Sequence, residues 1–375
     1  MAMIDRELLR DRFRGCMIGL AVGDALGMPV ETMTREEILA ATGGVGVTGY
    51  LAPLQQRFRS TARLAPGQWT DDTQLSLAIA RSLVRKRGFD LDDIAAEHVV
   101  EYHKGRRGWG RSTKIGIQEL AEGKRKPGEP VLDPEALGLG NGVAMKIAPL
   151  ALAEAQLIVP GGFGENAKRV ERLVYRFPGL VRSLAELTHR DACASIGAFI
   201  VSRAIQVALL RLSDRLSPML RAMWSFELGY HCKTHGESLL QSCARIAAHF
   251  VDREHGANRL MGALLPASEE DAQRALRPVY GDALHDALSH HACDVRESVP
   301  FVYATAMEHW ISFRDGVLAA VNAGGDTDSN AAMIGAILGA YHGLSAIPRE
   351  WVDGLEAHDE ITAIADQLFD LAMSR

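Results

Sequence analysis

Residues 322–343 read NAGGDTDSNAAMIGAILGAYHG, and this stretch indicates how the chain folds. Acids and hydroxyls follow a glycine pair, and an apolar run of helical length follows them. Within that run Gly335, Gly339 and Gly343 recur every fourth residue. Because residues four apart share one face of an α-helix, these glycines predict a stripe without side chains, where a second helix can pack closely.

A second stripe of the same kind lies near the N-terminus, in GCMIGLAVGDALGMPVE over residues 15–31. Its glycines, Gly15, Gly19, Gly23 and Gly27, are again four residues apart. A helical glycine costs about 0.5–1 kcal/mol relative to alanine. We expect close helix packing to offset that cost at most of these positions.

Helical periodicity also covers much of the remaining chain. Leu75, Ile79 and Leu83 recur every four residues within 74–86, and Thr34 to Glu37 fits a capping box. No series of short alternating segments predicts a β-sheet. The sequence therefore predicts an all-α fold, with one compact domain over residues 1–375. Further apolar helical stripes are expected at 184–210, 238–251 and 301–321, and loops at 48–68 and 123–142.

Composition limits the classes of function. The 375 residues are 47% hydrophobic, which suffices for a large core. The net charge of −6 argues against a general binder of phosphate backbones, although it allows a local basic patch. Five cysteines without paired spacing indicate reduced thiols. The charged N-terminal residues and the interrupted apolar stretch at 16–30 predict neither a secretory signal nor a membrane span, so we expect a cytoplasmic protein.

Two clusters of acids and hydroxyls precede predicted helices. The first is WTDDT at 69–73 and the second is GGDTDS at 324–329. Taken alone, such residues are common helix caps, and acids suit helix N-termini. The carboxylates and hydroxyls of the two clusters belong to Asp71, Asp72, Asp326, Asp328, Thr70 and Ser329.

Convergence of the clusters would require cations, because four carboxylates repel one another. Donors that are all oxygen suit Mg²⁺ or Mn²⁺ rather than zinc. Six such donors are enough for two ions about 3.5–4 Å apart, as in two-metal hydrolases. Periodicity alone does not decide whether the clusters converge.

Five segments of the chain resemble the ADP-ribosylglycohydrolase family and occur in that family's order. They are GCMIGLAVGDALGMPVE, GQWTDDTQLSLAI, GNGVAMKIAPLAL, THRDACASIGA and NAGGDTDSNAAMIGAILGAYHG. The resemblance implies that family's all-helical fold, with orthogonally packed helices, and a cleft with two Mg²⁺ or Mn²⁺ ions. It implies that the metal ligands are Thr70, Asp71, Asp72, Asp326, Asp328 and Ser329.

Glu31 closes the first of these segments. Alone it would be a solvated acid after Pro29. The resemblance places it beside the scissile bond, where a carboxylate could orient or deprotonate water, or handle the proton of the leaving group. On this basis we expect the catalytic residues to be Glu31, Asp72 and Asp326.

The resemblance also implies an ADP-ribose subsite. Gly140, Asn141 and Gly142 would form a simple turn when taken alone, but glycines before a helix expose N–H groups suited to phosphate. The family uses this segment, which includes Met145, for ADP-ribose. His189 matches a ligand-contacting histidine of relatives, and a hydrogen-bonded histidine at a helix start is the alternative.

Two positions depart from the family pattern. Lys146 stands where relatives usually carry arginine, which keeps the charge but loses the bidentate fork. Arg111 lies in a region where many relatives place an aspartate, so the target of this chain is open. Separately, His231 and His235 have the spacing of a zinc pair but lack the glutamate of that motif and a third ligand. We do not favour zinc there.

Together with the two acid clusters, the resemblance implies a hydrolase that releases ADP-ribose through an oxocarbenium-like state. The resemblance implies an arginine linkage on an ADP-ribosylated protein. A serine linkage, or ADP-ribose on nucleic acid or a small molecule, is the alternative target. The rival functions are a non-catalytic ADP-ribose-binding relative, which should have lost metal acids, and a two-metal phosphohydrolase.

Overall fold

The computed structural model describes residues 5–54, 61–134, 136, 138–155, 176–210 and 292–374. Within these ranges the regular elements are helices, and isolated β-bridges such as Thr34 to Gly324 pair residues of the connecting segments. The all-α prediction is confirmed. The α-helices are α1 (Arg6–Gly27), α2 (Arg35–Ala41), α3 (Asp71–Arg85), α4 (Leu91–Lys104), α5 (Arg111–Ala121), α6 (Ala148–Ala153), α8 (Phe177–Glu186), α9 (Ala192–Leu210), α15 (Val295–Glu308), α16 (Phe313–Val321), α17 (Thr327–His342), α18 (Arg349–Asp353) and α19 (His358–Met373).

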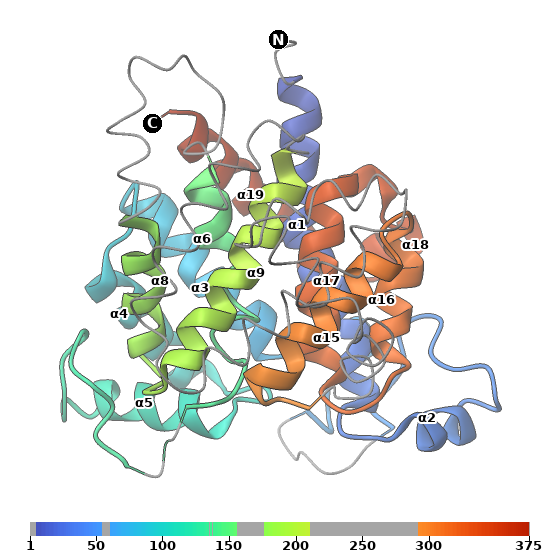
Figure 1. Ribbon diagram of the computed structural model, residues 1–375, viewed down its shortest axis with the longest axis horizontal. Coiled ribbons are helices and arrows are strands. Elements are labelled where there is room, and N and C mark those ends of the chain that lie inside the picture. Colours follow the sequence, from blue (N-terminus) through green and yellow to red (C-terminus); the bar gives the residue numbers. More distant parts are fainter. Residues whose placement is uncertain are drawn as a thin grey trace, which may run out of the picture.

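Helices α1 and α17 pack side by side through their glycine stripes (Figure 1). A side-chain carbon at Gly335 would overlap the carbonyl oxygen of Gly19, and one at Gly339 would overlap that of Gly15. The pairing is antiparallel, because Gly27 at the end of α1 faces Thr327 at the start of α17. The two predicted stripes are therefore each other's partners, and the end of α1 meets the start of α17.

The capping box is present as predicted. Thr34 Oγ1 accepts a hydrogen bond of 3.2 Å from the Glu37 amide, and Glu37 Oε2 accepts one of 2.8 Å from the Thr34 amide. The predicted helix at 74–86 also forms, as α3, although it begins three residues earlier at Asp71.

Two predicted helical stretches are each divided. The stretch 184–210 contains the end of α8 and the whole of α9, and 301–321 contains the end of α15 and the whole of α16. Ser312 caps α16 by accepting a hydrogen bond of 3.2 Å from Asp315 N, which marks the second break. The apolar pattern continues across each break because both helices bury a face in the same core. The stretch 238–251 lies outside the described residues.

Two helices are apolar and long enough for a membrane span by length and composition. They are Arg6–Val30, which includes a 3₁₀ turn after α1, and Ala192–Leu209. Within the protein, 94% and 89% of their apolar windows are buried. Such burial is typical of core helices, and the aromatic contact of Phe13 in α1 with Phe369 in α19 is part of that packing.

Candidate metal centre and active site

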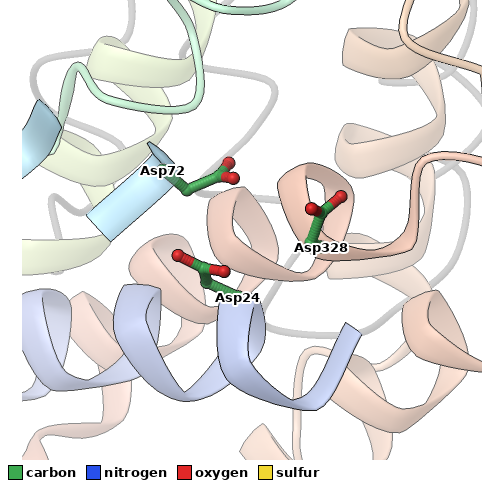
Figure 2. A group of neighbouring side chains, drawn as sticks. All are labelled: Asp24, Asp72 and Asp328. Carbon is green, nitrogen blue, oxygen red and sulfur yellow. The ribbon is translucent and has the colours of Figure 1, made fainter. Parts of the chain in front are cut away.

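Carboxylates from α1, α3 and α17 converge where the end of α1 meets the start of α17. Asp24, Asp72 and Asp328 each offer a carboxylate oxygen, and these atoms lie within 4.8 Å of one another (Figure 2). Glu31, Asp326 and Asp328 form a second group by the same measure. The two sequence clusters therefore meet, and Asp328 belongs to both groups.

The hydroxyl of Thr70 lies among three carboxylates. Its Oγ1 is 2.8 Å from Asp24 Oδ1, 3.1 Å from Asp72 Oδ2 and 3.5 Å from Asp328 Oδ2. A hydroxyl has one proton to donate, so it satisfies only one of these oxygens. A cation among the others would turn the remaining oxygens and the hydroxyl lone pairs into ligands.

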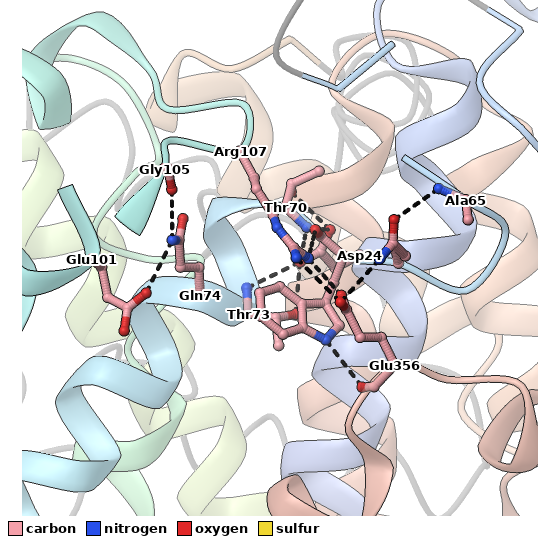
Figure 3. A network of polar contacts seen from close by, with 11 residues as sticks. Asp24, Ala65, Thr70, Thr73, Gln74, Glu101, Gly105, Arg107 and Glu356 are labelled. Atoms are coloured by element: carbon pink, nitrogen blue, oxygen red, sulfur yellow. Dashed lines mark hydrogen bonds and ion pairs between the residues drawn. The ribbon is translucent and has the colours of Figure 1, made fainter. Parts of the chain in front are cut away.

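Asp24 is a residue that the sequence reasoning missed. Its carboxylate accepts hydrogen bonds from Thr70 N at 2.9 Å, Thr73 N at 3.0 Å and Thr73 Oγ1 at 2.6 Å (Figure 3). These amides belong to the start of α3, so an acid of α1 caps another helix. Asp24 thereby takes the hydroxyl proton of Thr70 and directs the lone pairs of that hydroxyl toward Asp72 and Asp328.

The alternative that the acids and hydroxyls serve as caps is wrong for two positions. Thr70 and Asp326 occupy the N-cap positions of α3 and α17, but neither side chain accepts a capping hydrogen bond from a backbone amide of its own helix. Their oxygens face the cluster instead. The helix N-termini still contribute partial positive charge, which favours carboxylates nearby.

Burial makes the carboxylates costly to ionise without a counter-charge. It raises the pKa of Glu31 to about 9 and that of Asp71 to about 7. Glu31 Oε2 and Asp72 Oδ1 have no hydrogen-bond partner among the described residues. These oxygens and the crowded hydroxyl of Thr70 fit hard divalent cations. Burial also raises the pKa values of Asp24, Asp72, Asp326 and Asp328.

Lys146 brings a positive charge near the cluster. Its side chain is buried, and its Nζ has no hydrogen-bond partner within the described chain. Burial lowers the pKa of Lys146 to about 8, while the charge of Asp71 opposes this shift. The departure from arginine therefore leaves a single buried ammonium, which offsets only part of the negative charge.

Asn141 lies in the segment predicted to bind ADP-ribose, but its side chain points at Asp326, a predicted metal ligand. Its Nδ2 donates to Asp326 Oδ2 at 2.6 Å and to Ser298 Oγ at 2.9 Å. Ser298 Oγ donates in turn to Asn330 Oδ1 at 2.6 Å. Both amide protons of Asn141 are thus used inside the protein. Ser298, on α15, is a further residue that the motifs did not reveal.

The other predicted ligand residues lie around the same centre. His189 packs against Gly140 and Gly142, and Met145 Sδ lies 3.7 Å from Ser329 Oγ. The His189 ring nitrogen Nδ1 is 2.8 Å from Thr188 Oγ1. Burial lowers the pKa of His189 to about 3, so the ring is neutral at physiological pH. His189 is therefore a hydrogen-bonded histidine beside residues 140–142, here called the glycine loop.

An ion pair between Arg107 and Glu356 lies against Trp69, in the segment that leads into α3. Arg107 bonds to both carboxylate oxygens of Glu356, and its guanidinium lies 4.5 Å from the centre of the Trp69 ring. Trp69 Nε1 donates to the carbonyl of Glu356 at 3.1 Å. The segment between α18 and α19 thus fixes the residues just before Thr70. The possible zinc pair, His231 and His235, lies outside the described residues.

A helical protein that gathers acids from three helix ends into a buried cluster has the architecture of a metal-dependent hydrolase. The model of the ADP-ribosylglycohydrolase family matches residues 5–375, so the chain belongs to this family of glycosidic-bond hydrolases.

Individual relatives agree with the family over nearly their whole lengths. The ADP-ribosyl-[dinitrogen reductase] glycohydrolase of Rhodospirillum rubrum is 28% identical, over 97% of each chain. Human ADP-ribosylhydrolase ARH3 is 25% identical, over 95% of this chain and 92% of its own. A solved structure titled ADP-ribosylglycohydrolase-related protein complex has a TM-score of 0.62 and 26% identity, and the match covers 98% of this chain and 100% of that one.

Proposed function

We propose that the chain uses two divalent cations to cleave the glycosidic bond between ADP-ribose and a modified target. The position of the Thr70 hydroxyl among three carboxylates carries this proposal, because one proton leaves the remaining oxygens for cations. Mg²⁺ and Mn²⁺ suit donors that are all oxygen. The proposed metal ligands are Thr70, Asp71, Asp72, Asp326, Asp328 and Ser329.

When bound, the cations would offset the carboxylate charge, orient the distal ribose hydroxyls and lower the pKa of a water. Glu31 would then accept a proton from that water or return one to the leaving group, through its unpartnered Oε2. Asp24 holds Thr70, and Asn141 holds Asp326, so both ligands are oriented before substrate binds. The surrounding carboxylates would stabilise positive charge that develops on the ribose.

The family identifies the type of bond that is cleaved but not the molecule that carries the ADP-ribose. The name of the Rhodospirillum rubrum relative refers to ADP-ribosylated dinitrogen reductase, and the resemblance implies an arginine linkage on a protein. Serine, nucleic acid and small molecules are the alternative carriers. Cytoplasmic location and single-domain organisation stay predictions from the sequence.

A hydrolysis panel tests the proposal. Arginine-, serine- and nucleotide-linked ADP-ribose are each incubated with the enzyme in Mg²⁺, in Mn²⁺ and in EDTA. We expect metal-dependent release of intact ADP-ribose from at least one substrate. Release of AMP would indicate a phosphohydrolase, and binding of ADP-ribose without any turnover would indicate a non-catalytic relative.

A further inference from the structure

A basic segment lies next to the metal centre of this otherwise acidic protein. Residues 102–114 read YHKGRRGWGRSTK and contain no Asp or Glu. Lys104 is paired with Glu101 at 2.9 Å, and Arg107 is paired with Glu356. Arg106 and Lys114 are exposed, and the described residues provide no ion-pair partner for either. Two cations are therefore free to meet an anion from outside.

These two cations line a cavity. Its volume is about 390 Å³, within the range of small-molecule sites. Arg106 is held with its guanidinium 4.8 Å from the centre of the Tyr102 ring, so the charge is already positioned. The lining also includes the rings of two aromatic residues and a histidine, and its members are Tyr102, His103, Gly105, Arg106, Trp109 and Lys114.

The cavity wall is joined directly to the start of α3. Gln74 donates from Nε2 to the carbonyl of Gly105 at 2.8 Å, and its Oε1 accepts from Trp109 Nε1 at 2.8 Å. Gln74 lies three residues after Asp71. The same loop approaches the metal acids, since a side-chain carbon at Gly108 would lie 3.2 Å from Asp71 Oδ1. The cavity and the acid cluster thus share one loop and one helix turn.

We propose that this cavity, here called the 102–114 pocket, binds a phosphate-bearing nucleotide of the target, on the leaving side of the scissile bond. Free cations beside aromatic rings are typical of single-stranded nucleic acid sites. The same charges would repel the guanidinium of an arginine-rich target. The inference rests on the proposed function for its chemistry, but binding of a nucleotide to the pocket is independent of turnover.

A binding experiment tests the pocket first. The probe is a short single-stranded oligonucleotide with a 5′-phosphate and a 3′-fluorophore, titrated with the full chain in about 50 mM salt. Replacing Arg106 and Lys114 by glutamine should weaken binding at least about tenfold and reduce the slope of log affinity against log salt by about 0.7 for each lost contact. The control replaces Arg182 and Arg349 by glutamine, which removes the same charge from exposed helix positions.

Turnover provides the second arm. The ratio of kcat/KM for ADP-ribose on an oligonucleotide 5′-phosphate to that for arginine-linked ADP-ribose should fall about tenfold in the Arg106 and Lys114 variant. If wild type hydrolyses neither substrate, the proposed function fails while the binding result still decides the pocket.

Three results would overturn the pocket. One is equal oligonucleotide affinity in wild type and the double variant. Another is an equal loss of affinity for free ADP-ribose, which would place its own pyrophosphate there. The third is displacement of the probe by an acidic peptide that binds more tightly than the oligonucleotide, which would assign the site to a different class of target.

Discussion

Helices α1 and α17 form two regions of opposite character along one line of contact. In the middle, the glycine stripes bring backbone against backbone, and this packing is complete without any ligand. At the end, the same helices bring Asp24, Asp326 and Asp328 together as buried like charges. Close backbone packing in the first region therefore fixes the spacing of the carboxylates in the second, where Lys146 offsets only part of the negative charge and bound cations would offset more.

Removing one acid should break the charged region and leave the packed one intact. We expect Asp326→Ala to abolish turnover, a loss larger than the roughly 10²–10⁴-fold of a single general base. Its circular dichroism should match wild type, and its metal-free melting temperature should rise because one repelling charge is gone. Asp315→Ala, at an exposed acid in the first turn of α16, is the matched control. Full activity in Asp326→Ala, or in enzyme stripped with EDTA, would contradict the two-metal proposal.

Glu31→Gln should separate turnover from binding within the charged region. A proton-transfer group contributes about 10²–10⁴-fold to rate, so kcat should fall by that factor while ADP-ribose and both metals still bind. Calorimetry and steady-state kinetics on one preparation measure this, with Glu36→Gln at an exposed position as control. Normal turnover would make Glu31 a solvated acid, and joint loss of metals and turnover would make it a ligand or a structural residue.

The sequence predicts the individual helices better than it predicts which helices pack against each other. Both glycine stripes are visible as four-residue repeats, but periodicity carries no information on which helix faces which. The breaks near residues 187–191 and 309–312 escape prediction for a related reason. The apolar stripe records burial in a common core, and neighbouring helices share that core across a turn.

The candidate site shows the same division. The motifs predict six donors, and the structure brings four of them, Thr70, Asp72, Asp326 and Asp328, into the two acid groups that include Asp24 and Glu31. Asp24 was missed because it lies in a glycine-rich run read as packing, although a lone acid in a buried apolar helix signals a special partner. Ser298 stands in no motif. The direction of Asn141 toward Asp326 depends on contacts between residues far apart in sequence, which spacing does not encode.

The packed region can be tested with one methyl group. Gly335→Ala should lower the free energy of unfolding by about 3 kcal/mol, at the upper end for overpacking, because the obstacle is the backbone of Gly19 rather than a movable side chain. Gly179→Ala is the control, since that helical glycine has open space around it. It should gain about 0.5–1 kcal/mol. Urea unfolding of wild type and both variants measures these free energies. If Gly335→Ala is as stable as wild type, helices α1 and α17 separate easily enough to admit the methyl group.

The smallest expected effect concerns the link between the glycine loop and the charged region. The resemblance predicts that Asn141 serves ADP-ribose, whereas its hydrogen bond to Asp326 predicts that it orients a metal ligand. Residues that orient metal ligands typically contribute 10- to 100-fold to metal affinity. Because Asn141→Ala leaves Asp326 itself in place, we expect about tenfold weaker Mn²⁺ binding by calorimetry without ADP-ribose. Unchanged metal affinity with weakened ADP-ribose binding would instead make the segment a ligand loop, as the family resemblance implies.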